Sequence, residues 1–287
     1  MSGMAEPISN VAVLGAGIMG HGIAQVFAQS GKTVVLVDSV PRALESARKR
    51  IESSVQMLRQ NGILSAAEAN EALRHLTFTT QLEEAAGAAE IVFEAIPENL
   101  ALKQQLIQKL DDICAPGAIF CSNSSAIPPT RLARASRNPE RVVGTHFFNP
   151  AQLIPLVEVI TSDRTAPAVL TRVMELLSAV GKKPIHVRKD LPGFIANRLQ
   201  HALAREAISL VAQQVATPED IDTVVKNSIA LRLLFSGPVE QRDLNGLDTY
   251  LGITETLYPD LADMKEAPPL AREMVARGEL GLKTGKG

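Results

Sequence analysis

Short apolar runs alternate with longer amphipathic stretches through the N-terminal part of the chain. Seven runs have the length of strands, and several are apolar at nearly every position, as in strands buried on both faces. They are residues 11–14, 33–37, 91–95, 118–121, 142–146, 156–160 and 184–187. The segments between them, such as 20–30, 41–61 and 100–113, have helical periodicity. This alternation predicts an α/β fold with a mostly parallel, doubly wound sheet of the Rossmann type.

The pattern changes in the C-terminal part of the chain. Residues 193–215 carry apolar side chains at nearly helical spacing, and residues 247–257 and 269–277 also have a helical pattern. No strand pattern is evident there. The sequence therefore predicts two domains, a Rossmann-like domain over residues 1–189 and an all-α domain over residues 190–287.

Composition narrows the range of partners. With 29 Lys and Arg against 31 Asp and Glu, 3% aromatic residues and no Trp, the chain has neither the basic surface nor the stacking platform of a nucleic-acid-binding protein. No apolar run is long enough to cross a membrane, and residues 1–10 lack the features of a signal peptide. Cys114 and Cys121 are too few for a disulfide framework or a four-cysteine metal site. We expect a cytoplasmic protein with reduced thiols and no metal.

The strongest local motif follows the first apolar run. Gly15, Gly17 and Gly20 form G-x-G-x-x-G between a predicted strand and a predicted helix. Gly15 permits a tight turn, Gly17 lets the backbone approach a pyrophosphate, and Gly20 lets the helix pack against the strand. The free N–H groups at the helix start, near Ile18 and Met19, would bind the phosphates. The motif predicts a dinucleotide site; an empty glycine-rich turn is the alternative.

Asp38 indicates which dinucleotide binds. It ends the second predicted strand, 38 − 20 = 18 residues past the last glycine of the motif. A carboxylate there accepts hydrogen bonds from the ribose hydroxyls and repels a 2′-phosphate, so NAD is favoured over NADP. The alternative is a solvated acid at the end of a strand.

A histidine and a glutamate are the candidates for acid–base chemistry. Oxidation of an alcohol by NAD needs a base for the hydroxyl proton, and histidine suits that role near neutral pH. Among five histidines, His146 ends an apolar strand at the edge where the cofactor would bind. Glu158 lies inside the next apolar strand, where a carboxylate needs a partner, and His146 is the obvious one. A packed strand-end histidine and a glutamate bonded to backbone remain the alternatives.

Six motifs in the same order resemble those of the L-3-hydroxyacyl-CoA dehydrogenase family, and the resemblance covers essentially the whole chain. They are the glycine motif and residues 94–99, 122–125, 146–150, 156–159 and 190–198. The resemblance implies a catalytic pair at His146 and Glu158, with Ser125 and Asn197 contacting the substrate oxygen. It implies further cofactor contacts at Asp38, Glu98, Lys103, Asn123 and Ser125, and a helical C-terminal domain that forms a homodimer.

Some segments depart from the family pattern. Family members that use CoA commonly carry a lysine in the region matching residues 58–64, and this chain has none there. Ala126 stands where relatives usually have a second serine. Residues 153–158 and 231–238 look closer to L-gulonate and L-carnitine dehydrogenases, which act on CoA-free substrates. Relatives continue with aromatic residues where this sequence stops at Gly287, which leaves open whether the natural chain is longer.

Three functions follow as hypotheses. The first is an NAD-dependent dehydrogenase of 3-hydroxyacyl-CoA thioesters in fatty-acid metabolism, with Arg59 or Lys49 near the CoA phosphates. The second is a dehydrogenase of a CoA-free hydroxy acid or alcohol with the same fold. The third is a non-catalytic dinucleotide-binding protein, against which the complete set of candidate catalytic residues argues. We rank the acyl-CoA hypothesis first.

Overall fold

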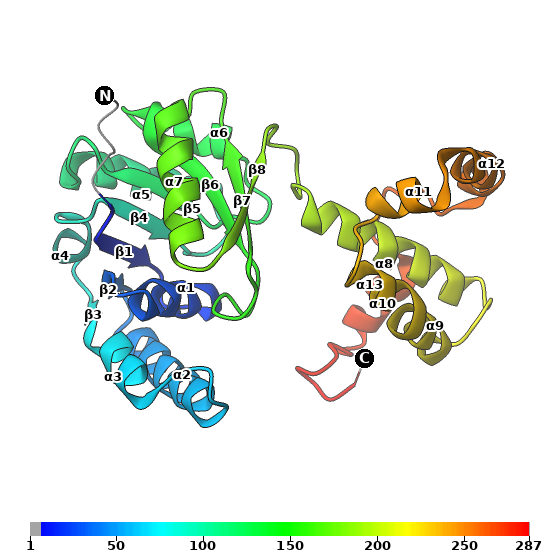
Figure 1. The fold of residues 1–287 in the computed structure, drawn as a ribbon, viewed down its shortest axis with the longest axis horizontal. Helices are drawn as coiled ribbons and strands as arrows, with labels where there is room; N and C mark the ends of the chain where they lie inside the picture. The colour runs from blue at the N-terminus through cyan, green and yellow to red at the C-terminus, as the bar shows by residue number, and fades with distance from the viewer. Residues whose placement is uncertain (1–6, 287) are drawn as a thin grey trace. The chain divides into compact units, whose positions relative to one another are not determined.

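The computed structural model describes residues 7–286, so residues 1–6 and 287 lie outside the described part. The expectation about a signal peptide therefore falls largely on residues outside it. The chain divides into two compact units between Ile195 and Ala196 (Figure 1), and each is described by itself.

The first unit is built on an eight-stranded sheet. Its strand order is β3-β2-β1-β4-β5-β6-β7-β8, and every neighbouring pair is parallel except β6 and β7. The strands are β1 (Asn10–Leu14), β2 (Thr33–Val37), β3 (Leu76–Thr79), β4 (Ile91–Glu94), β5 (Ile119–Ser122), β6 (Val142–Phe147), β7 (Leu156–Thr161) and β8 (Lys183–Val187). The order is that of a doubly wound α/β sheet, which confirms the predicted fold class.

Helices cover both faces of this sheet. They are α1 (Ile18–Gln29), α2 (Pro41–Gln60), α3 (Ala66–Arg74), α4 (Leu82–Ala86), α5 (Leu100–Ile113), α6 (Pro129–Ala133) and α7 (Pro167–Ala179), with a 3₁₀ turn at Pro139–Arg141. Side chains alternate along a strand, so Val11 and Val13 join one core with α1, α2 and α7. Ala12 and Leu14 join the other core with α4, α5 and α6. This is why the strands are apolar at nearly every position.

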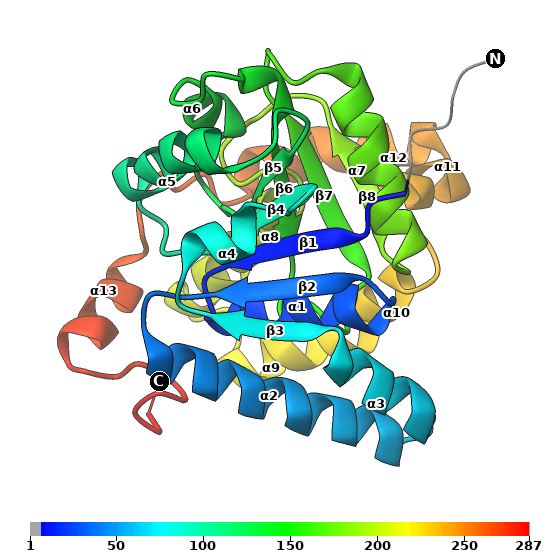
Figure 2. The same cartoon turned by 90° about the vertical axis from the view of Figure 1, so that its left-hand side faces the viewer.

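The sequence analysis missed one strand, β3. It has only two apolar positions, Leu76 and Phe78, which pack against the core while Thr77 is exposed. It pairs with β2 at the edge of the sheet, beside α2 and α3 (Figure 2). A four-residue edge strand with one apolar face gives a weak signal, because half of its side chains face water.

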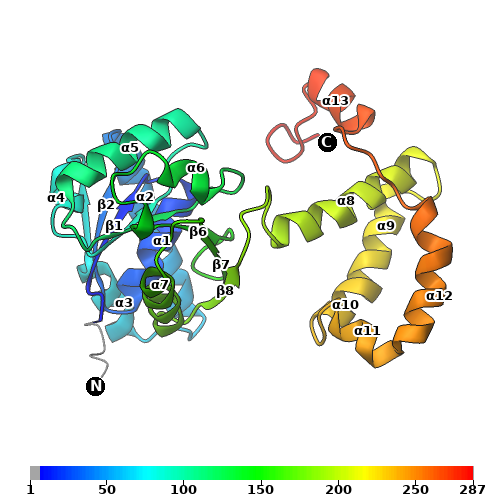
Figure 3. The same cartoon turned by 90° about the horizontal axis from the view of Figure 1, so that it is seen from above.

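The second unit is helical. Its elements are α8 (Ala196–Ala212), α9 (Pro218–Val224), a π-helical turn (Val225–Ile229), α10 (Ala230–Leu233), α11 (Glu240–Asn245), α12 (Leu247–Leu257), a 3₁₀ turn (Tyr258–Asp260) and α13 (Pro269–Ala276), as Figure 3 shows. Thr217 caps α9 by accepting a hydrogen bond from the Asp220 N–H, with Pro218 at the first helical position. No side chain of residues 196–286 is fully buried. Phe235 and Leu234 are 89% and 77% exposed.

The two cysteines are free and buried in the first unit. Burial raises the pKa of the Cys114 thiol to about 11, so it stays protonated and unreactive at neutral pH. Within residues 7–286, no helix combines the length and the apolar character needed to cross a bilayer.

Candidate active site

The glycine motif forms the turn from β1 into α1. Gly15 has φ +99°, and a side chain there would place its Cβ 2.7 Å from the Ala95 carbonyl oxygen. A Cβ on Gly20 would collide with the Gly15 carbonyl, whereas a Cβ on Gly17 would meet nothing within 4 Å. Gly17 is the N-cap of α1 and provides no side-chain cap, so the N–H groups of the first turn can bind an anion. This cradle fits a dinucleotide pyrophosphate.

Asp38 links this turn to the start of α2. Its Oδ2 accepts a hydrogen bond from the Ala16 N–H at 2.8 Å, and its Oδ1 accepts one from the Val40 N–H at 2.9 Å. A carboxylate oxygen accepts more than one hydrogen bond, so ribose hydroxyls can still bind here. The backbone contacts fix the orientation of the carboxylate before any cofactor arrives.

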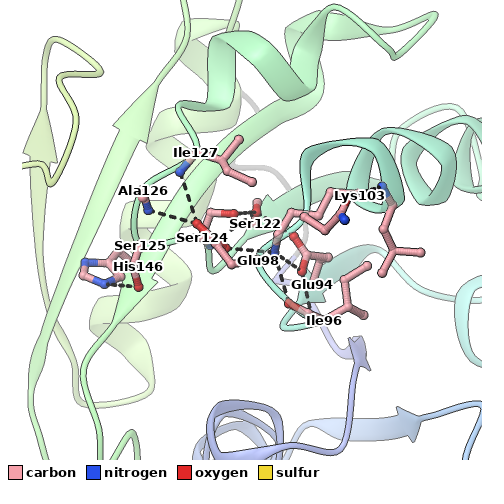
Figure 4. A network of polar contacts seen from close by, with 12 residues as sticks. Glu94, Ile96, Glu98, Lys103, Ser122, Ser124, Ser125, Ala126, Ile127 and His146 are labelled. Carbon is pink, nitrogen blue, oxygen red and sulfur yellow. Dashed lines mark hydrogen bonds and ion pairs between the residues drawn. The ribbon is translucent and has the colours of Figure 1, made fainter. Parts of the chain in front are cut away.

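His146 and Glu158 are direct cross-strand neighbours, because β6 and β7 pair antiparallel with these two residues in register. The His146 Nδ1 lies 2.8 Å from the Glu158 Oε2, and the pair is 4% and 0% exposed. A carboxylate at Nδ1 holds the proton on that nitrogen, which leaves a lone pair on Nε2. The Ser125 Oγ lies 3.1 Å from that Nε2 (Figure 4).

The pair is held from both sides. The other carboxylate oxygen of Glu158 accepts a hydrogen bond from the Ile195 N–H at 2.9 Å. The rings of Phe148 and Phe194 lie against the His146 ring, with centroids 4.5 and 5.6 Å away. Apolar walls and a doubly bound carboxylate restrict rotation of the imidazole and limit its contact with water.

A second polar network lies at the ends of β4 and β5 (Figure 4). Lys103 on α5 is 1% exposed, and its ammonium donates to the Glu94 Oε1 at 2.6 Å and to the Ile96 carbonyl at 3.2 Å. The Ser122 hydroxyl donates to the Glu94 Oε2 at 2.6 Å. The structure thus places Lys103 beneath the loop after β4, among protein partners.

Glu98 connects this network to the loop that carries Ser125. Its Oε1 accepts from the Ala126 and Ile127 N–H groups at 3.0 and 3.2 Å, and its Oε2 lies 3.5 Å from the Lys103 ammonium. Partial burial raises the pKa of Glu98, but these N–H groups, the Lys103 charge and the Ser124 hydroxyl outweigh it and lower the pKa overall. The carboxylate is therefore ionised at neutral pH.

Two further candidate residues are Asn123 and Asn197. The Asn123 Oδ1 accepts a hydrogen bond from the Phe147 N–H at 2.8 Å, so this side chain joins the ends of β5 and β6. Asn197 lies in the first turn of α8, in the second unit, and is partly exposed.

Sequence reasoning included Glu94 and Ser122 in its motifs but gave neither of them a role in the site. The available signal was a glutamate that ends a continuous apolar strand, with Lys103 in the following helix. A carboxylate in such a place needs a cationic or hydroxyl partner. The sequence could not tell whether Lys103 reaches Glu94 or the cofactor.

An open groove of about 440 Å³ runs along α2. It is lined by His21, Ser46, Lys49, Arg50, Ser53, Ser54, Met57, Leu58, Gln152 and Leu153. The His21 Nδ1 lies 2.9 Å from the Gly17 carbonyl. Burial lowers the pKa of His21 despite this hydrogen bond, and the Arg50 charge lowers it further. Arg59 is not among the lining residues, whereas Lys49 is.

Comparison with known proteins agrees with this arrangement. Residues 10–191 match the model of the 3-hydroxyacyl-CoA dehydrogenase NAD-binding domain, and residues 193–287 match the model of the C-terminal domain of the same family. The chain belongs to the 3-hydroxyacyl-CoA dehydrogenase family. It is an oxidoreductase with an NAD-binding Rossmann fold, as its motifs predicted.

Relatives within the family have different substrates in their names. A probable 3-hydroxybutyryl-CoA dehydrogenase of Bacillus subtilis is 40% identical, with 98% of this chain and 96% of that protein covered. A 5-formyl-3-hydroxy-2-methylpyridine 4-carboxylate 5-dehydrogenase of Mesorhizobium japonicum is 35% identical, with 98% and 90% covered.

Solved structures give the same two substrate types. The crystal structure of a pyridine-carboxylate dehydrogenase of that name, described as an NAD⁺-dependent dismutase, has a TM-score of 0.90 at 35% identity, with 98% of this chain and 90% of that chain covered. An (S)-3-hydroxybutyryl-CoA dehydrogenase from Ralstonia eutropha has a TM-score of 0.80 at 38% identity, with 98% of both chains covered.

Asp38 predicts the choice between the two nicotinamide dinucleotides. We expect kcat/KM with NAD to exceed that with NADP by at least about tenfold, roughly 1.4 kcal/mol, since the carboxylate repels a 2′-phosphate. The Asp38→Asn variant keeps the size of the side chain without its charge, so it should lower the ratio of kcat/KM with NAD to kcat/KM with NADP. Equal kcat/KM for the two cofactors in the parent enzyme would contradict this role.

Proposed function

We propose that this family member interconverts an L-3-hydroxyacyl-CoA and the 3-ketoacyl-CoA, with His146 as the general base. The observation that carries the proposal is the buried chain of contacts from Glu158 through His146 to Ser125. A histidine with one nitrogen held by a carboxylate and the other directed at a hydroxyl has the geometry of a base for an alcohol.

In the oxidative direction, the substrate hydroxyl gives its proton to the Nε2 of His146. Glu158 stabilises the imidazolium that forms, through the hydrogen bond at Nδ1. Ser125 donates to the oxygen that becomes the carbonyl, and the role implied for Asn197 at the same oxygen stays a prediction. NAD, when bound, accepts the hydride from the substrate carbon that bears this hydroxyl. In the reductive direction, the imidazolium returns its proton to the oxygen.

The groove along α2 supports a CoA substrate. Lys49 and Arg50 bring positive charge to it, Ser53 and Ser54 bring hydroxyl donors, and Met57 adds apolar surface. This mixture suits a ligand with phosphates at one end and an apolar arm. Each exposed charge–phosphate contact contributes only about 1 kcal/mol or less, so one missing lysine does not exclude CoA.

The second candidate is a CoA-free hydroxy acid or alcohol. The pyridine-carboxylate dehydrogenase favours it, because that relative has the same two-domain architecture and no CoA in the name of its substrate. The Lys49 ammonium also forms an ion pair with Glu45 at 2.9 Å, which offsets its charge in the groove. The catalytic pair serves either substrate equally well.

The catalytic assignment predicts the effect of removing the base. His146→Ala should lower kcat by about 10²–10⁴-fold, the usual contribution of a positioned general base. Glu158→Gln keeps the shape of the side chain but removes the charge that stabilises the imidazolium, so kcat should also fall while NAD affinity changes little. Turnover at the parent rate in a folded His146→Ala protein would refute the assignment.

The groove predicts a preference among substrates. We expect kcat/KM for acetoacetyl-CoA to exceed that for free acetoacetate, dehydrocarnitine or, in the oxidative direction, L-gulonate, measured by NADH absorbance. Lys49→Ala should raise KM for acetoacetyl-CoA by about two- to fivefold, as loss of one exposed contact allows, and should leave KM for a free acid unchanged. A free acid that outperforms acetoacetyl-CoA would establish the second candidate instead.

The second unit predicts a homodimer. Its helices leave many large apolar side chains exposed, and a helical segment of this size cannot cover them all by itself. We expect a C₂ dimer formed mainly through this unit. Light scattering at micromolar concentration should give twice the mass of the chain; the mass of a single chain would show that these surfaces stay uncovered.

A further inference from the structure

Ser125 is an exposed loop residue, and its hydroxyl oxygen lies 3.1 Å from the His146 Nε2. The loop connects β5 to α6 and has no regular secondary structure. A serine on such a loop loses conformational freedom only if something outside the loop holds it. A displacement of about 1 Å at a reacting group is enough to cost orders of magnitude in rate.

Glu98 holds this loop on both sides of Ser125. Its carboxylate accepts hydrogen bonds from the Ala126 and Ile127 N–H groups after the serine and from the Ser124 hydroxyl before it (Figure 4). The carboxylate belongs to a different segment of the chain, the turn between β4 and α5. It therefore positions the loop from outside, as a fixed anion bound by several donors.

The anchor of Glu98 is itself rigid. Lys103, 3.5 Å from the Glu98 Oε2, is fully enclosed, and its ammonium is bound to Glu94 and to the Ile96 carbonyl. Glu94 in turn accepts from Ser122, the last residue of β5. The ends of β4 and β5, the start of α5 and the Ser125 loop thus form one continuous hydrogen-bonded network.

We propose that Glu98 is a positioning residue for the reaction, which acts on the substrate oxygen through Ser125. This inference rests on the proposed catalytic roles of His146 and Ser125. It differs from the role that the family resemblance implies for Glu98, a contact with the cofactor, because it predicts a loss in kcat that depends on the Ser125 hydroxyl.

A double-mutant cycle tests the inference. Glu98→Ala is measured in the parent enzyme and in Ser125→Ala, with kcat taken at saturating substrate and cofactor and with the Kd of NADH taken from its fluorescence. We expect Glu98→Ala to lower kcat by about 10- to 100-fold in the parent, in line with the cost of misplacing a reacting group. In Ser125→Ala the same change should lower kcat less than about twofold, since the two residues act as one unit.

Matched variants separate charge, geometry and folding. Glu98→Gln keeps an oxygen that can accept from the Ala126 and Ile127 N–H groups, and should recover most of the lost kcat. Glu83→Ala removes an exposed carboxylate outside this network and should behave as the parent. If Glu98→Ala does not fold, Glu98→Asp takes its place: it keeps the charge but draws the carboxylate back from the loop, so kcat should fall in the parent and not in Ser125→Ala.

Two results would overturn the inference. One is a loss in kcat of the same size in both backgrounds, which would mean that Glu98 acts independently of Ser125. The other is an unchanged kcat with weaker NADH binding only, which would make Glu98 a cofactor contact and nothing more. Failure of the catalytic assignment itself is recognised separately, because His146→Ala would then turn over normally whatever the cycle gives.

Discussion

The buried pair of Glu158 and His146 sets the requirements that the rest of this site meets. A carboxylate with no solvent exposure inside a strand is strongly destabilising unless its oxygens are bound. Here one oxygen faces the His146 Nδ1 and the other accepts from the Ile195 N–H. Removal of either partner would take one of these contacts from a buried charge. The pair therefore constrains both the pairing of two strands and the path of the chain after β8.

The antiparallel direction of β7 relative to β6 makes the pairing of Glu158 with His146 possible. In the parallel part of the sheet, the carboxyl ends of the strands lie at one edge. This edge carries the turn after β1 together with Glu94, Ser122 and His146. Glu158 lies inside β7, so it reaches this edge only if β7 pairs with β6 in a register that sets it beside a residue at the end of β6. Reversal of β7 places Glu158 directly opposite His146 on the same face of the sheet. One antiparallel pair in an otherwise parallel sheet thus brings a carboxylate to the histidine.

The sequence predicted those parts of the molecule in which the structure tolerates only a few residue types at each position. Continuous apolar runs indicate strands buried on both faces, and the glycine motif leaves little choice of backbone at Gly15 and Gly20. Edge strand β3 was missed because half of its side chains face water. The contacts of Lys103 could not be predicted either, because the sequence pattern around a helical lysine is the same whether its ammonium contacts a cofactor or a buried glutamate such as Glu94. Distances between side chains on different elements decide that question, and periodicity carries no information on them.

The difference between buried and exposed side chains explains why the sequence indicates the family more clearly than the substrate. In the proposed mechanism, the chemistry depends on buried, mutually bound groups, for which a single change weakens the support of a buried charge or misplaces the base. In the proposed function, substrate choice depends on the open groove along α2. Exposed side chains there, such as Lys49, each contribute about 1 kcal/mol or less and can exchange partners with neighbours such as Glu45. A change in such a groove would leave the catalytic pair intact, and the names of similar chains include both a CoA thioester and a pyridine carboxylate. Under the proposed function, the reaction is therefore specified by the sheet, whereas the substrate is specified by the surface of α2 and the loop with Gln152 and Leu153 that lines the same groove.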